Sequence, residues 1–73
     1  MNNTEKSIFF YIACIFDFAE KNNLSIKESY IYLNKYNGIQ YLIDNYEIEH
    51  TLSKEDTLQA LSNITIKGGG YLK

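Results

Sequence analysis

Residues that could cross-link this chain or hold a metal are almost absent. Its 73 residues include a single cysteine, Cys14, and a single histidine, His50. One cysteine excludes an intramolecular disulfide, and the two residues together fall short of the roughly four ligands of a structural zinc site. A domain this small is only marginally stabilised by its own core. The sequence therefore favours either a very well-packed core or association with a second chain.

Proline is also absent, and no glycine- or serine-rich stretch occurs before residue 68. Nothing therefore marks an internal domain boundary. We expect a single domain over residues 1–73, with a helical core at residues 5–67 and a flexible glycine-rich tail at residues 68–73.

Arginine is missing as well, since all seven basic residues are lysine, and nine acidic residues bring the net charge to −2. Specific recognition of bases and phosphates relies on the arginine fork and on a basic surface. We therefore expect no nucleic-acid partner. A helix-turn-helix can be drawn across residues 25–46, but its recognition helix, residues 39–46, carries no basic side chain. A DNA-binding regulator is the weaker alternative.

The longest apolar run, residues 8–16, is too short to cross a membrane, which takes roughly 20 apolar residues. No small-x-small cleavage site follows it, and Asp17, Glu20 and Lys21 do, so it does not resemble a secretory signal. We interpret the run as a buried helix and expect a cytoplasmic protein that has no membrane partner.

Helix-starting and helix-ending residues divide the chain. Ser25 and Glu28 have the spacing of a capping box, and Ser53 precedes two acidic residues, as is typical of helix N-termini. Asparagine pairs and Asn-Gly tolerate the left-handed conformation that ends helices. The expected helices are residues 5–21, 26–36, 39–46 and 54–67, with a connector at residues 47–52.

Residues 63–67 are rich in β-branched side chains, so a short terminal strand competes with the end of the last helix. No partner strand is evident elsewhere in the sequence. The expected fold is therefore all-α, a compact bundle of about four short helices followed by the glycine-rich tail.

The first helix is apolar on every side. At 100° per residue, one side carries Ile8, Ile12, Ile15, Phe16 and Ala19, and nearly the opposite side carries Phe10, Cys14 and Phe18 with Tyr11 beside them. A helix that is apolar all round must be buried all round. One interpretation is that the other helices wrap it completely. The other is that the Phe10, Cys14 and Phe18 side stays open for a second chain, because exposed aromatic patches mark interaction sites.

Residues that could carry out catalysis are few. Asp44, Glu47, Glu49 and His50 follow one another closely, but their spacing matches no metal motif, and a histidine at a helix end often caps carbonyl groups. Cys14 lies within an apolar run, where a free thiol behaves as a small apolar residue. The glycines at 68–70 follow a helix, whereas phosphate loops precede one. We expect no enzyme activity, no cofactor and no metal.

Residues 32–53 resemble a family of short, uncharacterised proteins of bacteria and mobile elements, classed as a domain of unknown function. The resemblance rests on the order of an aromatic residue, Gly38, Leu42, Ile43, Tyr46, Glu49 and His50. Looser similarity extends over residues 5–70. The resemblance implies a helical protein without catalytic motifs, often encoded beside an ADP-ribosyltransferase-like protein, as toxin–antitoxin pairs are. It transfers no binding residues.

The expected function is therefore binding to a protein, as an antitoxin-like partner of such a toxin. Inhibition of a host defence protein by a phage or mobile element is the alternative, and a homodimer is compatible with either. Seven tyrosines suit an interface, because tyrosine combines apolar area with a hydroxyl group. The candidate partner-binding residues are Phe10, Tyr11, Cys14, Phe18, Tyr46, Glu49, His50 and Tyr71.

Overall fold

The computed structural model describes residues 3–70, and the side chains of residues 7–70. Over that part the chain is all-helical and contains no strand, so the expected fold class is confirmed and residues 63–67 are helical. Four helices have seven or more residues, and a fifth is a single turn. They are α1 (Asn3–Lys21), α2 (Ile26–Lys35), α3 (Gly38–Asp44), α4 (Tyr46–Glu49) and α5 (Lys54–Lys67).

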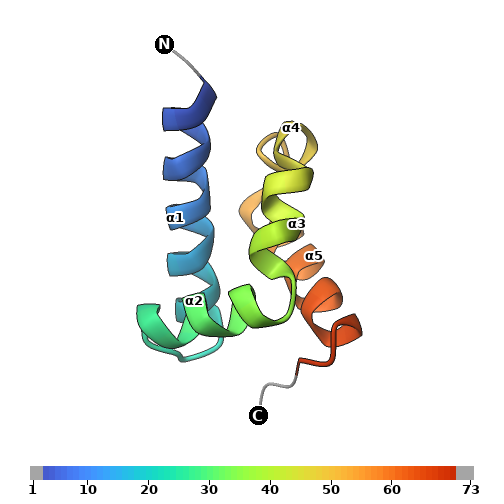
Figure 1. Cartoon of the computed structure of the whole chain (residues 1–73). Coiled ribbons are helices and arrows are strands. Elements are labelled where there is room, and N and C mark those ends of the chain that lie inside the picture. Colours follow the sequence, from blue (N-terminus) through green and yellow to red (C-terminus); the bar gives the residue numbers. More distant parts are fainter. Residues whose placement is uncertain (1–2, 71–73) are drawn as a thin grey trace.

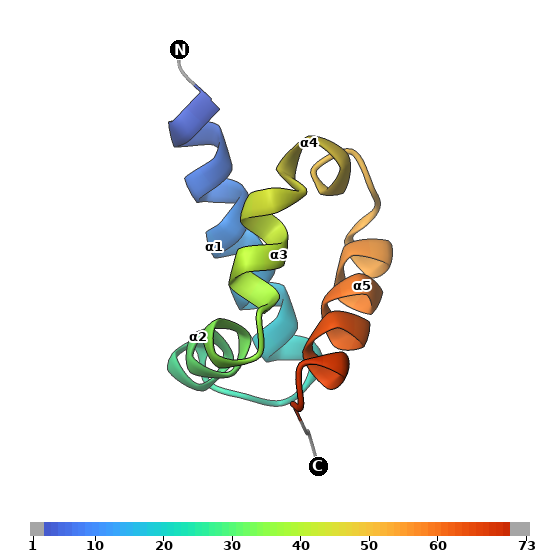
Figure 2. The ribbon, with the colours of Figure 1, turned by 45° about the vertical axis from the view of Figure 1, so that its right-hand side comes forward.

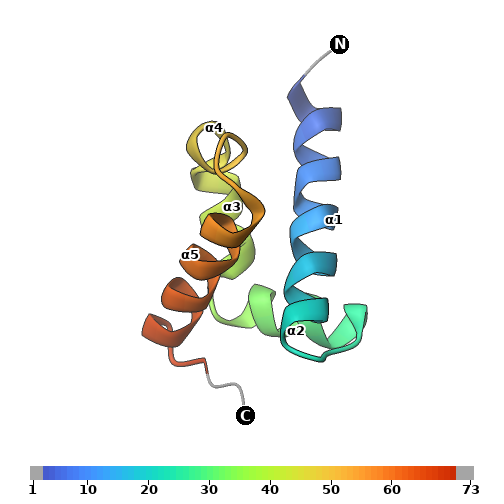
Figure 3. The same cartoon turned by 180° about the vertical axis from the view of Figure 1, so that it is seen from behind.

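The helices form a compact bundle around one side of α1. In Figure 1, α1 and α3 stand side by side, α2 crosses below them, and α4 sits at the far end of α3. The turned view separates α5 from the α1 and α3 pair (Figure 2). From behind, α5 lies in front of α3, and both helices lie on the same side of α1 (Figure 3). Helix α1 contacts α2, α3 and α5.

The helix ends follow the capping residues that the sequence predicts. Ser25 Oγ accepts from the Glu28 amide at 3.0 Å, and Glu28 Oε1 accepts from the Ser25 amide at 2.8 Å, which completes the capping box. Ser53 Oγ accepts from the Asp56 amide at the start of α5. Asn23 and Asn37 are the non-glycine residues with positive φ in the described chain, and they end α1 and α2. Local chemistry therefore sets where the chain turns.

The predicted connector at residues 47–52 is wrong in part, because Tyr46–Glu49 forms the helical turn α4. Helix α3 also ends at Asp44 rather than at residue 46. Asn45 causes the break: its side-chain amide and its backbone amide both donate to the Tyr41 carbonyl, each at 3.0 Å. The chain then resumes helical geometry, with the Glu49 amide donating to the Asn45 carbonyl at 2.8 Å.

Residues 68–70 of the expected glycine-rich tail form the end of α5 through backbone hydrogen bonds. The Gly70 amide donates to the Thr65 carbonyl at 2.7 Å and the Gly69 amide to the Ile66 carbonyl at 3.0 Å, the pattern of a Schellman cap. Gly69 has a φ of +98°, which favours glycine. A Cβ on Gly70 would lie 2.5 Å from the Tyr32 hydroxyl. Residues 71–73 lie outside the described residues.

The hydrophobic core holds one side of α1 against three other helices. Phe18 is completely buried and stacks on Tyr32 of α2, with 5.7 Å between ring centroids. Ser29 Oγ donates to the Ile15 carbonyl at 2.8 Å and fastens α2 to α1. The buried members of the core cluster are Cys14, Phe18, Leu33, Leu42, Leu58 and Leu61.

Truncation of two phenylalanines of α1 should change the free energy of unfolding by very different amounts. Phe18→Ala removes a buried ring and should lower the free energy of unfolding by about 3–5 kcal/mol. Phe9→Ala changes a side chain that is 71% exposed, so it should change that free energy by no more than about 0.5 kcal/mol. Urea unfolding followed by far-UV circular dichroism measures both. Equal losses from the two variants would contradict the placement of the core.

Candidate protein-binding surface

The exposed side of α1 is the one opposite the core. Ile8, Ile12 and Phe16, here called the α1 stripe, are 48%, 56% and 52% exposed. They recur every four residues, so they lie along one face of the helix. Side chains of this size usually lie in a core rather than in water. Contiguous exposure of three of them marks the stripe as a surface suited to contact with another molecule.

Both interpretations of the first helix are therefore wrong in part. Complete wrapping fails because the α1 stripe is exposed. An open Phe10, Cys14 and Phe18 side fails because Phe18 is completely buried and Cys14 is 6% exposed. The stacking of Phe18 on Tyr32 decides which of the two apolar sides faces the core. Sequence periodicity could not make that choice, since both sides carry similar side chains.

Phe10 and Tyr11 are half-buried in an aromatic cluster with Tyr46 of α4. Ring centroids lie 5.4 Å apart for Phe10 and Tyr46 and 6.2 Å apart for Tyr11 and Tyr46, both edge to face. Edge-to-face pairs add about 0.5–1.5 kcal/mol beyond the area they bury. These three candidate residues therefore hold α4 against α1, and Tyr46 also stacks on the exposed His50.

Glu49, a candidate partner-binding residue, is buried at 3% exposure, so its side chain is not available at the surface. The Tyr41 hydroxyl donates to Glu49 Oε2 at 2.6 Å, and Oε1 has no hydrogen-bond partner among the described residues. Donation to this carboxylate, followed by burial, raises the pKa of Tyr41 to about 12. Thr57 Oγ1 also donates to the Glu49 carbonyl, at 3.3 Å. Glu49 therefore ties α3, α4 and α5 together.

Cys14 lies in the core, on the side of α1 opposite the α1 stripe. Burial, and then the negative charges of Asp17 and Glu49, raise the pKa of the Cys14 thiol to about 12. The thiol is the unreactive form, because thiolate is the nucleophile. The geometry agrees with the interpretation of Cys14 as a small apolar core residue.

His50 is exposed at the C-terminal end of α4. Its ring stacks on the Tyr46 ring at 4.5 Å, and its Nδ1 lies 2.7 Å from the Tyr46 carbonyl oxygen. This contact caps the helix end, as expected from its position, and requires the proton on Nδ1. No group of three or more His, Cys, Asp or Glu side chains in the described part of the chain is placed to share a metal ion.

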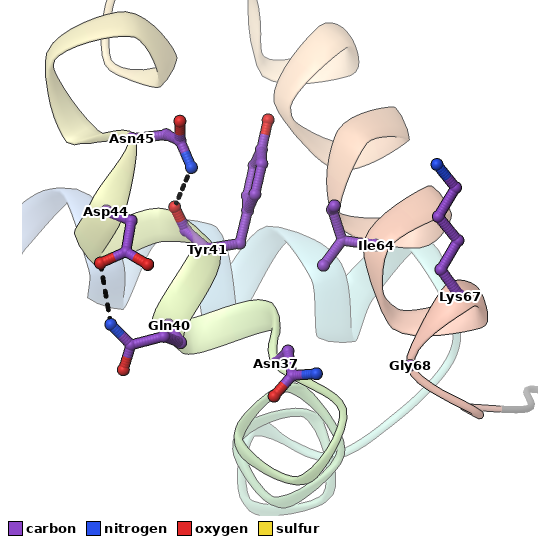
Figure 4. A pocket seen from close by; sticks show the side chains of 8 residues that line it. All are labelled: Asn37, Gln40, Tyr41, Asp44, Asn45, Ile64, Lys67 and Gly68. Carbon is purple, nitrogen blue, oxygen red and sulfur yellow. Dashed lines mark hydrogen bonds between the residues drawn. The ribbon is translucent and has the colours of Figure 1, made fainter.

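A shallow hollow of about 360 Å³ lies between α3 and α5 (Figure 4). The polar groups on its α3 side largely satisfy one another: Gln40 Nε2 donates to Asp44 Oδ1 at 2.9 Å, and Asn45 donates to the Tyr41 carbonyl. Figure 4 shows the Tyr41 ring standing between the helices, with its hydroxyl directed away from Gln40. The sequence alone does not indicate this hollow, because its two walls come from segments that are distant in the chain.

The remaining candidate, Tyr71, lies outside the described residues. Among the described helices, none is long and apolar enough to cross a membrane. Sequence reasoning missed Ile12 and Phe16 as surface residues. The sequence does show an excess of apolar residues on the first helix. This excess predicts that one apolar side is exposed, but it does not show which of the two sides that is.

Removing the Tyr41 hydroxyl should leave Glu49 without a donor. Tyr41→Phe should lower the free energy of unfolding at pH 7 by about 1–3 kcal/mol, the cost of an unsatisfied buried acceptor. Because the pKa of Tyr41 is raised from 10.0 to about 12, this contribution is complete below pH 10 and disappears as the pH rises toward 12. Denaturant unfolding across this pH range measures it.

Tyr30→Phe provides the matched control, because Tyr30 is 47% exposed. It should change stability by no more than about 0.5 kcal/mol at any of these pH values. A gap between wild type and Tyr41→Phe that stays constant up to pH 12 would argue against the Tyr41–Glu49 hydrogen bond as its source.

Comparison with known proteins assigns the chain to a family. The family model described as protein of unknown function (DUF3791) matches residues 9–65, a segment that begins in α1 and ends in α5. No curated protein and no solved structure matches the chain. The expected membership in a family of unknown function is thereby confirmed, and the association with a toxin stays a prediction. The chain belongs to the DUF3791 family of proteins of unknown function.

Proposed function

We propose that this protein is a non-catalytic protein-binding module that acts as the antitoxin-like partner of an ADP-ribosyltransferase-type toxin. The observation that carries the binding role is the exposed α1 stripe of Ile8, Ile12 and Phe16. The choice of a toxin as the partner rests on the family resemblance of residues 32–53. The proposed function thus combines an exposed apolar surface with a sequence that holds few candidate catalytic residues.

The size of the stripe sets what it can contribute. Three half-exposed side chains of this kind leave roughly 300 Å² of apolar surface in water, the lower end of the largest patches on monomeric proteins. Burying that area contributes about 7 kcal/mol at ~25 cal/mol per Å². Association costs about 4–15 kcal/mol in lost freedom. Polar contacts around the stripe must therefore supplement it.

The polar contacts come from the rim of the helix bundle rather than from Glu49, which is buried. His50 is exposed, and its stacking on Tyr46 fixes the ring in one orientation. A pre-oriented ring loses little entropy when it forms a hydrogen bond to a partner. In this proposal the apolar stripe covers the partner's cleft and Tyr46 and His50 contribute at the edge of the interface.

A charged residue in the centre of the stripe should weaken the complex. Co-expression of this protein with an ADP-ribosyltransferase-like toxin encoded beside its gene should restore growth and yield a complex on copurification. Ile12→Asp should weaken that complex at least about tenfold, because a buried unpaired charge is costly. Isothermal titration calorimetry and growth of the host measure the two effects.

Ile66→Asp is the matched control, since Ile66 is 63% exposed on α5 and the same charge is introduced away from the stripe. It should bind and protect as the wild type does. A toxin that is neutralised equally by Ile12→Asp would refute the stripe as the binding surface. Absence of any complex between wild type and toxin would refute the antitoxin role.

A further inference from the structure

We propose that residues 46–52, here called the α4 lid, open as a unit while the rest of the helix bundle stays folded, and that each opening uncovers Phe10 and Cys14 of α1. This inference goes beyond the proposed function, because it concerns the side of α1 opposite the α1 stripe and a movement of the chain rather than a partner. The observation that carries it is a buried carboxylate, that of Glu49, at the point where the lid is fastened to its neighbours.

The α4 lid lies over the side of α1 that carries Phe10 and Cys14. Tyr46, its first residue, packs edge to face on Phe10, with 5.4 Å between ring centroids. Leu52, its last residue, lines the same pocket of about 190 Å³ as Phe10 and Cys14. Figure 1 shows α4 at the far end of α3, where the chain turns toward α5. Movement of the lid alone therefore uncovers these two side chains.

The hydrogen bonds of the lid are mostly local, so it can open without breaking the other helices. The amides of Glu49 and Leu52 donate to the carbonyls of Asn45 and Glu49, at 2.8 and 3.1 Å respectively. Helix α4 has only four residues, and a single helical turn is not stable by itself. On Glu49, Oε2 accepts from the Tyr41 hydroxyl at 2.6 Å, and the carbonyl accepts from Thr57 Oγ1 at 3.3 Å. The polar fastening of the lid to α3 and α5 therefore passes through one residue.

This fastening carries a cost, because Glu49 brings a carboxylate into the core. The residue is 3% exposed, and its Oε1 has no hydrogen-bond partner among the described residues. No ion pair in the described part of the chain includes Glu49, since Lys54 pairs with Asp17 and Glu20. A buried carboxylate without a cation and with an incomplete set of donors loses more hydration than it regains. Opening the lid returns this group to water, which lowers the free energy of opening.

Cys14 makes the opening measurable. In the closed form it is 6% exposed, and burial, followed by the charges of Asp17 and Glu49, raises the pKa of its thiol to about 12. Alkylating reagents react with the thiolate, so the closed form is both inaccessible and protonated. In the open form the burial is relieved, and the thiol becomes accessible to a small reagent. The rate of Cys14 alkylation therefore follows the population of the open lid.

The dependence on urea distinguishes opening of the lid from unfolding of the whole domain. Alkylation of the full wild-type chain with iodoacetamide should vary little with urea well below the unfolding transition, because local opening exposes little surface. Hydrogen exchange should agree, with the amides of Glu49 and His50 exchanging faster than that of Leu61 in α5. An alkylation rate that rises with urea from the outset, in parallel with global unfolding, would overturn the proposal.

Substitutions at the buried carboxylate and its donor test the cause of the opening. Glu49→Met removes the charge and keeps an apolar side chain of similar length, so Cys14 alkylation should slow at least about fivefold. Tyr41→Phe removes the donor to Oε2 and should accelerate alkylation about tenfold. Tyr30→Phe, a change at an exposed tyrosine, should leave the rate unchanged. Circular dichroism checks that each variant is folded, and alkylation in concentrated urea checks that the unfolded thiols react alike.

Two results would contradict this cause and overturn the proposal. A Glu49→Met chain whose thiol reacts as fast as that of the wild type, or faster, would show that the carboxylate does not favour opening. A Tyr41→Phe chain that reacts no faster than the Tyr30→Phe chain would show that the lid is not fastened through Glu49. Slower reaction of the first variant together with faster reaction of the second supports the proposal.

Discussion

The structure depends on the burial of one side of α1 by the helices that follow it. Phe18 lies at the centre of this contact, completely buried and stacked on Tyr32. Helices α2, α3 and α5 are too short to surround a helix of 19 residues, because a chain of this size encloses only a small core. Covering one apolar side therefore leaves the other in water. That constraint produces the exposed stripe, and the surface proposed for binding follows from it.

A second constraint lies at the opposite end of the bundle, where a carboxylate is buried. Glu49 receives one hydrogen bond from Tyr41, and its carbonyl receives another from Thr57. Burying a charged or polar group is costly unless it is hydrogen-bonded, so these contacts specify how α4 sits between α3 and α5. The same burial removes Glu49 from the surface. The edge of the proposed interface is left to the stacked pair of Tyr46 and His50.

The sequence by itself determined the all-α class, the capping of α2 by Ser25 and the turn at Asn37, because each depends on residues close together in the chain. It also showed that the first helix carries more apolar residues than a small core can bury. Only the tertiary structure decided that Phe18 faces inward and Ile12 outward, and that Glu49 is buried. The reason is physical: these outcomes depend on contacts between residues distant in sequence, and helical periodicity treats two apolar sides alike.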